Sequence, residues 1–318
     1  MTRLTDALER ARQGNSSDSV TITPDVPAVP RAEERVELQA HEDRRSLFDD
    51  SQPSTDDRPD EQRVEAHYHF AQSAAVKLVV GPKPDHTLVE QYRHLAATLH
   101  HAQLKDGVRT IMITSAVEAE GKTTTAANIA LTLSHSHQRR VLLIDADLRR
   151  PSLHTVFQEA NRDGLGDYLR DFGPRRKKPE IHQISPTLSL LTAGRPTQDP
   201  MSALVSQEMK DLVDEAAEHF DWVIIDTPPV ALLSDANLLA GMIDGAILVV
   251  RANSTAYPLV QRAQASIGSQ RILGVVLNRA RRSDLAVGYG YYYYGYSYKP
   301  VDQQEPRGLR RLFSRRPQ

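Results

Sequence analysis

The strongest constraint on the fold of this chain is a series of five short apolar runs separated by spans of helix length. The runs consist mostly of Val, Ile and Leu and occupy residues 110–114, 141–144, 222–225, 246–250 and 272–277. Runs that are apolar at nearly every position, rather than at every second one, are typical of strands buried on both faces of a parallel sheet. The sequence therefore predicts an α/β domain over residues 75–284, with a mostly parallel sheet and helices on both faces.

The composition excludes several classes of protein. A formal net charge of −2 over 318 residues gives no overall field that would attract nucleic acid. The absence of cysteine excludes disulfides, thiolate metal ligands and cysteine nucleophiles, and it is compatible with a reducing compartment. The best candidate for a membrane span, residues 231–250, contains Asp235, Asn237 and Asp244, and the N-terminus lacks the apolar core of a signal peptide. We expect a soluble, cytoplasmic protein that does not bind nucleic acid.

The first 70 residues differ from the rest of the chain in charge and in apolar content. They hold 16 Asp and Glu against 9 Lys and Arg, a net charge of −7, and few large apolar side chains. Such a segment buries too little surface to offset the entropy lost on ordering, which predicts a mostly disordered acidic linker over residues 15–70. Residues 4–12 are the exception, because Leu4, Ala7 and Leu8 share one helical face. This short helix is either a docking element or a frayed helix without a partner.

A candidate phosphate-binding loop follows the first predicted strand. Residues 116–123 match the phosphate-loop pattern, except that Ala116 replaces its leading Gly. A helix is predicted over residues 123–134, so backbone N–H groups of the loop and of the helix N-terminus would hold phosphates. Lys122 would reach the β- and γ-phosphate oxygens, and the Thr123 hydroxyl would bind Mg²⁺. The pattern predicts a P-loop NTPase fold with ATP and Mg²⁺ as cofactors. The predicted nucleotide-binding residues of the loop are Ala116, Glu120, Gly121, Lys122, Thr123 and Thr124.

Three aspartates follow two of the other predicted strands. Asp145 and Asp147 come after residues 141–144, and Asp226 comes after residues 222–225. Ligands of open α/β sheets bind at the carboxyl ends of the strands, and Mg²⁺ prefers oxygen ligands such as carboxylates. A lone Asp after a strand is usually a helix cap. Three of them beside a phosphate loop instead favour a catalytic and metal-binding role.

A cluster of tyrosines lies near the C-terminus. Seven of the eleven tyrosines fall within ten residues, and Gly290 and Gly295 interrupt the cluster. The phenol groups would not all find partners in a core, and glycine weakens a strand, so we expect residues 285–318 to be flexible. Taken alone, the cluster is typical of a sticky low-complexity tail. Beside a nucleotide site it favours a set of phosphate acceptors. The predicted acceptors are Tyr289, Tyr291, Tyr292, Tyr293, Tyr294, Tyr296 and Tyr298.

Together these motifs resemble one family, the bacterial tyrosine kinases of capsule and exopolysaccharide synthesis of the CpsD/CapB type. The resemblance covers residues 85–298. It rests on the tyrosine cluster, on Gly-Lys-Thr at 121–123, on Val-Leu-Leu-Ile-Asp-Ala-Asp-Leu-Arg at 141–149 and on Val-Ile-Ile-Asp-Thr-Pro-Pro at 223–229. It implies a protein-tyrosine autokinase that uses ATP and Mg²⁺ to phosphorylate its own C-terminal tyrosines. The phosphorylation would regulate the polymerisation and export of a polysaccharide.

The resemblance also implies roles for single residues. Asp145 would accept the proton of the tyrosine hydroxyl, and Asp147 and Asp226 would bind Mg²⁺ together with the Thr123 hydroxyl. Arg149 either stabilises phosphate charge or forms a surface ion pair. In a separate position, after the strand at 272–277, Asn278 either contacts adenine or caps the strand end.

The loop departs from the family pattern at two positions. The family usually reads Pro-Gly-Glu-Gly-Lys, whereas Glu118 and Ala119 stand here in place of the Pro and the first Gly. If the position of Ala119 requires a positive φ, alanine costs about 1–2 kcal/mol there. The change bears on the shape of the loop rather than on its identity.

A predicted helix near residue 90 carries part of a third family motif, Glu-x-x-Arg-x-x-Arg, through which relatives assemble into rings. The chain has Glu90 and Arg93, but Ala96 replaces the second Arg. The pair is either an oligomer contact or an i,i+3 ion pair on a solvated helix. The resemblance further implies two partners. One is a protein tyrosine phosphatase, and the other is the cytoplasmic tail of a membrane chain-length regulator, which would recruit the kinase to the inner face of the membrane.

Two other functions compete with this interpretation. A partitioning or septum-site ATPase of the same superfamily would carry an extra Lys five residues before Lys122, where this chain has Val117. Such ATPases generally lack a tyrosine cluster. A weakly catalytic scaffold, which binds nucleotide and recruits partners through its tails, is compatible with the substituted loop.

The last predicted feature is a basic segment at residues 307–317. It contains five arginines and no acid, together with Leu309, Leu312 and Phe313. Arginines near an anionic surface and inserted apolar side chains both favour peripheral membrane contact. We expect this segment to touch an anionic membrane or an acidic partner; the alternative is a solvated basic tail.

Overall fold

A computed structural model describes residues 47–48, 68–81, 83–171, 177–197, 199–232 and 236–281. All of them belong to one compact unit, Ser46–Gln318. The predicted helix at residues 4–12, the tyrosine cluster and the basic segment at 307–317 lie outside the described residues, as does most of the acidic linker.

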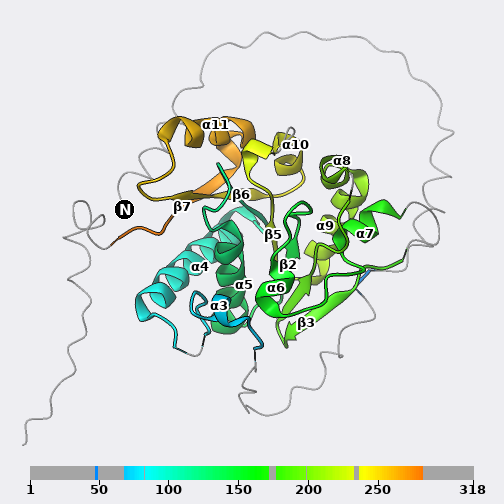
Figure 1. Ribbon diagram of the computed structural model, residues 1–318, viewed down its shortest axis with the longest axis horizontal. Coiled ribbons are helices and arrows are strands. Elements are labelled where there is room, and N and C mark those ends of the chain that lie inside the picture. Colours follow the sequence, from blue (N-terminus) through cyan, green and yellow to red (C-terminus); the bar gives the residue numbers. More distant parts are fainter. Residues whose placement is uncertain are drawn as a thin grey trace, which may run out of the picture. The chain divides into compact units, whose positions relative to one another are not determined.

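The described residues form a seven-stranded sheet with the order β3-β4-β2-β5-β1-β6-β7 (Figure 1). All neighbouring strands are parallel except β3 and β4. The strands are β1 (Thr110–Ser115), β2 (Val141–Asp145), β3 (Ile181–Ser185), β4 (Leu188–Leu191), β5 (Trp222–Asp226), β6 (Gly245–Arg251) and β7 (Ile272–Asn278). The five predicted strands and the mostly parallel sheet are confirmed. Strands β3 and β4 were missed, because β4 has four residues and β3 mixes apolar with polar side chains at the sheet edge.

Helices cover both faces of the sheet. They are α3 (Gln72–Ala75), α4 (His86–Asp106), α5 (Lys122–His137), α6 (Leu153–Phe157), α7 (Leu165–Arg170), α8 (Pro200–Leu204), α9 (Gln207–His219), α10 (Ala236–Gly241) and α11 (Tyr257–Ile267). The 3₁₀ turns η2 (Val230–Leu232) and η3 (Ser269–Arg271) complete the elements. The predicted helix at 123–134 is α5, which begins one residue earlier and extends three residues further.

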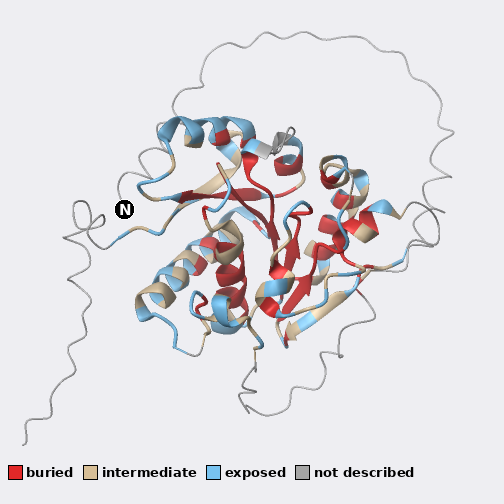
Figure 2. Ribbon diagram, viewed as in Figure 1, coloured by how far each residue is buried: buried red, intermediate tan, exposed pale blue. Residues whose placement is uncertain are grey.

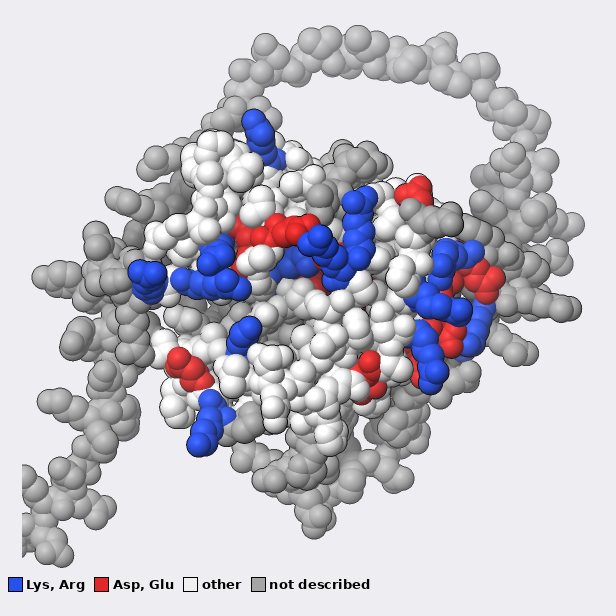
Figure 3. All heavy atoms as spheres, viewed as in Figure 1, with Lys and Arg blue, Asp and Glu red and all other residues white. Residues whose placement is uncertain are grey.

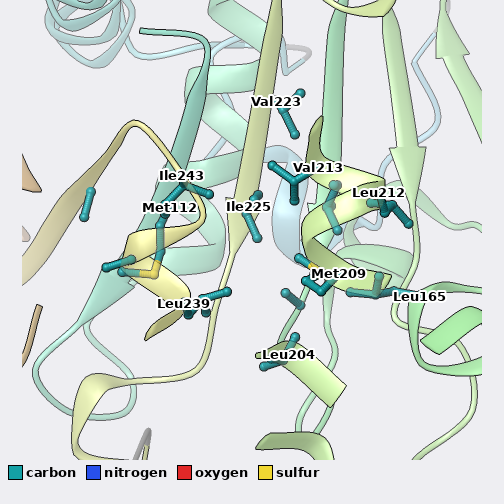
Figure 4. Close-up of a cluster of buried hydrophobic side chains, with 14 of the residues drawn as sticks. Met112, Leu165, Leu204, Met209, Leu212, Val213, Val223, Ile225, Leu239 and Ile243 are labelled. Atoms are coloured by element: carbon teal, nitrogen blue, oxygen red, sulfur yellow. The ribbon is translucent and has the colours of Figure 1, made fainter. Parts of the chain in front are cut away.

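The core consists of two layers, one on each face of the sheet (Figure 2). Successive residues of a strand contribute to opposite layers, as β2 shows: Leu142 packs with α7 to α11, whereas Leu143 packs with α4, α5 and α6. Burial on both sides explains why the strands are apolar throughout. Figure 4 shows the layer that contains Leu142, where Met209 and Val213 of α9 lie on the side of Ile225 of β5.

The surface of the domain has no single sign of charge on the side that Figure 3 displays. Acidic and basic side chains lie next to one another there. Among the described residues, no helix is both long enough and apolar enough to span a bilayer.

The topology determines where a ligand site forms. Strands β2, β5 and β1 are consecutive in the sheet, so their carboxyl ends lie side by side. Asp145 at the end of β2 is the register partner of Asp226 at the end of β5. The loop between β1 and α5 begins at the same edge, where open α/β sheets bind their ligands.

Candidate functional site

The predicted phosphate loop joins the end of β1 to the start of α5. Two of its residues have left-handed backbones: Ala119 with φ 61° and Gly121 with φ 96°. Ala119 therefore stands where the backbone favours glycine, and the strain of about 1–2 kcal/mol expected for alanine applies. Gly121 is required for space as well, since a Cβ there would lie 2.0 Å from Nδ2 of Asn278.

Glu120 holds this loop from the inside. Its carboxylate is almost fully buried and accepts hydrogen bonds from the backbone N–H of Val117 at 2.9 Å and of Arg251 at 3.1 Å. The hydroxyl of Thr255 donates a third hydrogen bond. The side chain thus ties the phosphate loop to the turn between β6 and α11. Its partners belong to the protein, so only its backbone remains available to a nucleotide.

Asn278, at the end of β7, supports the same loop. Its Nδ2 donates to the carbonyl oxygen of Glu120 at 2.7 Å, and its Oδ1 accepts the backbone N–H of Arg279 at 2.8 Å. The amide therefore lies against the phosphate loop, and contact with adenine remains a prediction. Neither this role nor that of the Glu120 side chain was apparent from sequence, because both depend on contacts more than 130 residues apart.

Lys122 lies among the three predicted aspartates. Its Nζ is 2.7 Å from Oδ2 of Asp147, and both side chains are largely buried. Burial by itself lowers the pKa of Lys122, but the attraction of Asp226, Asp147 and Asp145 together outweighs burial, so the pKa is raised from its ordinary value. Lys122 is therefore a permanent positive charge at the start of α5.

Asp226 is a fully buried carboxylate without a hydrogen-bond partner for either oxygen. Burial raises its pKa to about 6, against the opposing effects of the Lys122 ammonium and the Thr123 hydroxyl. The Thr123 hydroxyl is close enough to lower this pKa but does not meet the geometry of a hydrogen bond. An unpartnered buried carboxylate is rare in folded proteins and indicates a place for a cation.

Asp145 is equally buried but fully engaged. Its Oδ2 accepts the backbone N–H groups of Ser152 at 3.0 Å and Leu153 at 2.9 Å, and its Oδ1 accepts that of Asp147 at 3.2 Å. Burial and the neighbouring Asp226 raise its pKa to about 7, and the backbone hydrogen bonds oppose this rise. A carboxyl group that titrates near neutral pH is suited to take up and release a proton.

The residues predicted to bind Mg²⁺ lie together. The Thr123 hydroxyl is 3.5 Å from Nζ of Lys122, which pairs with Asp147, and it receives a 3.4 Å contact from the Ser152 hydroxyl. Within the described ranges, no three or more His, Asp or Glu side chains form a metal cage. Mg²⁺ typically binds through one or two carboxylates, with phosphates and water completing the octahedron. The hydroxyl and the orphaned Asp226 oxygens therefore fit Mg²⁺.

The arginines after β2 behave differently from one another. Arg149 is exposed, and its charge helps to lower the pKa of Asp199 after the hydrogen bonds from Ser202. Arg150 forms an ion pair of 2.5 Å with Glu118, a residue of the phosphate loop. Both partners are largely exposed, so this pair is worth about 0–1 kcal/mol. Glu118 stands where the family pattern has a proline, and this ion pair was not predicted from the sequence.

A cavity of about 300 Å³ adjoins the site. Thr123, Thr124, Ser152 and Thr155 line it together with residues before α4, which are Ala71, Ser73, Ala74, Lys77 and Leu78. It reaches Ser152, whose backbone N–H binds Asp145.

The candidate oligomer contact lies elsewhere, on α4. Glu90 and Arg93 form an exposed i,i+3 ion pair of 2.8 Å, with side chains 60% and 54% exposed. Within this single chain, Glu90 and Arg93 therefore form the solvated ion pair that was the alternative to an oligomer contact. A contact between subunits at these residues remains a prediction.

The chain is similar to a known protein family and to several known proteins. The model of the ParA family, described as NUBPL iron-transfer P-loop NTPase, matches residues 108–294. The tyrosine-protein kinase YwqD of Bacillus subtilis is 36% identical over 201 residues, which cover 61% of this chain and 82% of YwqD.

Two solved structures are similar. The kinase domain of Escherichia coli tyrosine kinase ETK is 29% identical, with a TM-score of 0.59, and the match covers 70% of this chain and 87% of ETK's. The chimerical protein CapA2B2 is also 29% identical with a TM-score of 0.59, over 65% of this chain and 91% of that one. Because a tyrosine-protein kinase 36% identical to this chain is covered over 82% of its length, the chain belongs to the bacterial tyrosine-protein kinases, and the ParA model over residues 108–294 gives the family its P-loop fold.

Proposed function

We propose that this protein is a protein-tyrosine autokinase that transfers the γ-phosphoryl group of ATP to its own C-terminal tyrosines. The observation that carries the proposal is the pairing of two buried carboxyl groups with different surroundings, Asp145 and Asp226, beside Lys122. One is held as a proton acceptor, and the other is unpartnered where a cation would lie. Phosphoryl transfer requires little more from a protein than positioning and charge neutralisation.

Each residue then has a defined task. The backbone N–H groups of residues 119–124 would hold the phosphates, and the Lys122 ammonium would offset the charge of the β- and γ-phosphate oxygens. Thr123, Asp147 and Asp226 would hold Mg²⁺, which neutralises charge on the phosphates when bound. Asp145 would orient the tyrosine hydroxyl and take its proton as the new P–O bond forms and ADP leaves. Arg149 would add positive charge near the transferred group.

The acceptors in this proposal are the seven tyrosines of residues 289–298. Each phosphate adds about −1.5 to −2 charges at neutral pH. Several phosphates would turn a near-neutral segment into a strongly anionic one, which the three aspartates would repel. Phosphorylation would therefore release the acceptor and favour separate subunits over a ring formed through Glu90 and Arg93.

The proposed setting is the synthesis of capsule or exopolysaccharide at the inner face of the membrane. Relatives that share this architecture include CapB of Staphylococcus aureus and the chimera CapA2B2, which carries a CapA part as well as a CapB part in its name. We propose that the cytoplasmic tail of a membrane co-polymerase recruits and activates this kinase, and that a tyrosine phosphatase reverses its action.

The decisive experiment is incubation of the purified full-length chain with ATP and Mg²⁺, followed by mass spectrometry and an anti-phosphotyrosine blot. We expect phosphate within residues 289–298. A matched variant with all seven cluster tyrosines changed to Phe should lose the signal while it retains nucleotide binding. Phosphate mainly at Tyr68, Tyr92, Tyr168 or Tyr257, or an undiminished signal in the Phe variant, would contradict the proposal.

ATP hydrolysis without any phosphotyrosine would instead favour the ATPase alternative. Nucleotide binding without turnover would favour the scaffold. Val117, in place of the extra lysine of partitioning ATPases, argues against the first of these.

A further inference from the structure

The dipeptide Leu47–Phe48 is anchored to the kinase domain at a distance from the nucleotide site. Phe48 is only 2% exposed. Its ring meets Phe220 edge-on, with ring centroids 5.6 Å apart, and lies 5.5 Å from the ring of His219. The backbone N–H of Leu47 donates to the carboxylate of Glu215. The residues on either side of this pair, 46 and 49–67, are outside the described ranges.

We call the receiving surface the α9 socket, formed by Glu215, His219 and Phe220 at the C-terminal end of α9. Met209, Leu212 and Val213 of α9, labelled in Figure 4, belong to the same buried layer as Phe48 and Phe220. The socket thus contacts the dipeptide in two ways: Glu215 accepts the backbone N–H of Leu47, and His219 and Phe220 pack against the ring of Phe48. This is how domains bind short linear peptides, with a buried aromatic residue as the anchor.

The sequence contains a second copy of the anchor. Leu-Phe occurs at 47–48 and at 312–313 and nowhere else in the chain. Two arginines precede each copy, Arg44 and Arg45 before the first and Arg310 and Arg311 before the second. The copies differ on their C-terminal side, where Asp49 and Asp50 follow the first and Arg315 and Arg316 follow the second.

The charge of α9 favours the second copy. The helix carries five acids, Glu208, Asp211, Asp214, Glu215 and Glu218, against one lysine, Lys210, which pairs with Asp214. Two described cationic side chains lie near its C-terminal end: Arg109, which donates to the Ala217 carbonyl, and Arg140, which pairs with Asp221. Acids still outnumber these cations along the helix, so an arginine-rich peptide gains attraction there that a peptide ending in Asp-Asp does not.

We propose that the α9 socket is a docking site for a Leu-Phe motif, and that Leu312–Phe313 of the same chain is its second occupant, in exchange with Leu47–Phe48. The tail would dock with its arginines along the acids of α9. Thirty residues lie between Arg281 and Leu312, and this segment spans up to about 100 Å when extended. A domain of roughly 240 residues has a radius of gyration of about 18 Å, so the tail reaches the socket from any exit. This inference does not depend on kinase activity.

The test uses a chain that contains no cysteine, so a single Ser314→Cys change gives a unique labelling site. A spin label there reports by electron paramagnetic resonance how much of the tail is immobilised, without ATP. We expect Phe48→Ala, and more mildly Leu47→Ala, to raise the immobilised fraction several-fold by vacating the socket. In the same backgrounds, Leu312→Ala with Phe313→Ala should abolish immobilisation, whereas the matched change Leu309→Ala should not.

Charge provides an independent arm. Changing Arg310, Arg311, Arg315 and Arg316 to Glu alters only residues outside the described fold and should release the label, as should high salt. If Phe48→Ala does not fold, Leu47→Ala and these tail variants decide the matter. No change in label mobility across all variants would overturn the proposal.

Two further outcomes would overturn it in favour of other partners. Immobilisation that rises with protein concentration would mean that the tail docks on a second copy. Immobilisation that occurs only with vesicles of anionic lipid, and equally in wild type and Phe48→Ala, would assign the tail to a membrane. Immobilisation that is independent of concentration and of vesicles, and sensitive to residue 48, supports docking within one chain.

Discussion

The ends of β2 and β5 carry chemically identical side chains in opposite circumstances. Asp145 and Asp226 are register neighbours, and each is fully buried. Asp145 accepts three backbone N–H groups, whereas neither oxygen of Asp226 has a hydrogen-bond partner. Backbone N–H groups therefore satisfy the carboxylate of Asp145, whereas the oxygens of Asp226 have no such partner among the described residues. Their hydrogen bonds alone give the two carboxyl groups different environments, on which the proposed roles of proton acceptor and cation ligand rest.

The largest expected effect comes from removing the positive charge that both carboxylates share. Lys122→Met should lower the rate of phosphotyrosine formation by at least about 100-fold, since preorganised charges at a transferring group contribute on that order. Circular dichroism should show that the variant remains folded, because Lys122 contacts only the site. Wild-type activity in a folded Lys122→Met protein would remove the phosphate-loop assignment.

The comparison between the two aspartates predicts stability changes of opposite sign. Without nucleotide and Mg²⁺ at pH 7.5, Asp226→Asn should stabilise the fold by about 1–3 kcal/mol, because it removes a buried charge that lacks hydrogen bonds and that Lys122 offsets only in part. Asp145→Asn should destabilise it by a similar amount. The amide NH₂ group would face backbone N–H groups, which donate to the carboxylate in the wild type and would lose their acceptor. Both variants should lose kinase activity. Chemical denaturation measures the difference, and changes of the same sign would show that the two environments are equivalent.

The same contrast predicts how stability depends on pH. The pKa of Asp145 is raised to about 7 and that of Asp226 to about 6, so the folded protein binds more protons than the unfolded chain between about pH 4 and pH 7. The stabilisation from these protonated groups is fully present below pH 4 and is lost as the pH rises through 6 to 7. Melting without ligands should therefore shift to lower temperature over this window. Mg²⁺ with ATP should flatten the slope, and an unchanged slope would contradict the cation site at Asp226.

The smallest expected effect concerns the loop between these residues. Ala119→Gly should stabilise the protein by about 1 kcal/mol, because φ is 61° there and alanine is strained. The matched change Ala116→Gly, at a buried position without positive φ, should destabilise it by a similar amount. Thermal melting measures both. Destabilisation by Ala119→Gly would mean that the strain at this position is absent.

Several parts of this picture were accessible from residues alone. The five apolar runs predicted the parallel strands, because a strand buried on both faces must be apolar at every position, as Leu142 and Leu143 illustrate. The phosphate loop was predicted because its glycine and lysine serve local geometry and charge. Strands β3 and β4 were not predicted, since a short antiparallel edge lacks that apolar signal.

The sequence by itself therefore determined the class of fold, the edge of the sheet where ligands bind and the identity of the loop. These features depend on local patterns and on the rule that parallel strands end together. The tertiary structure alone decided that Asp145 is satisfied and Asp226 is not, that Glu120 faces inward to Arg251 and Thr255, and that Phe48 is buried against α9. The physical reason is that burial and hydrogen bonding arise between segments far apart in the chain, where identical residue types meet different neighbours.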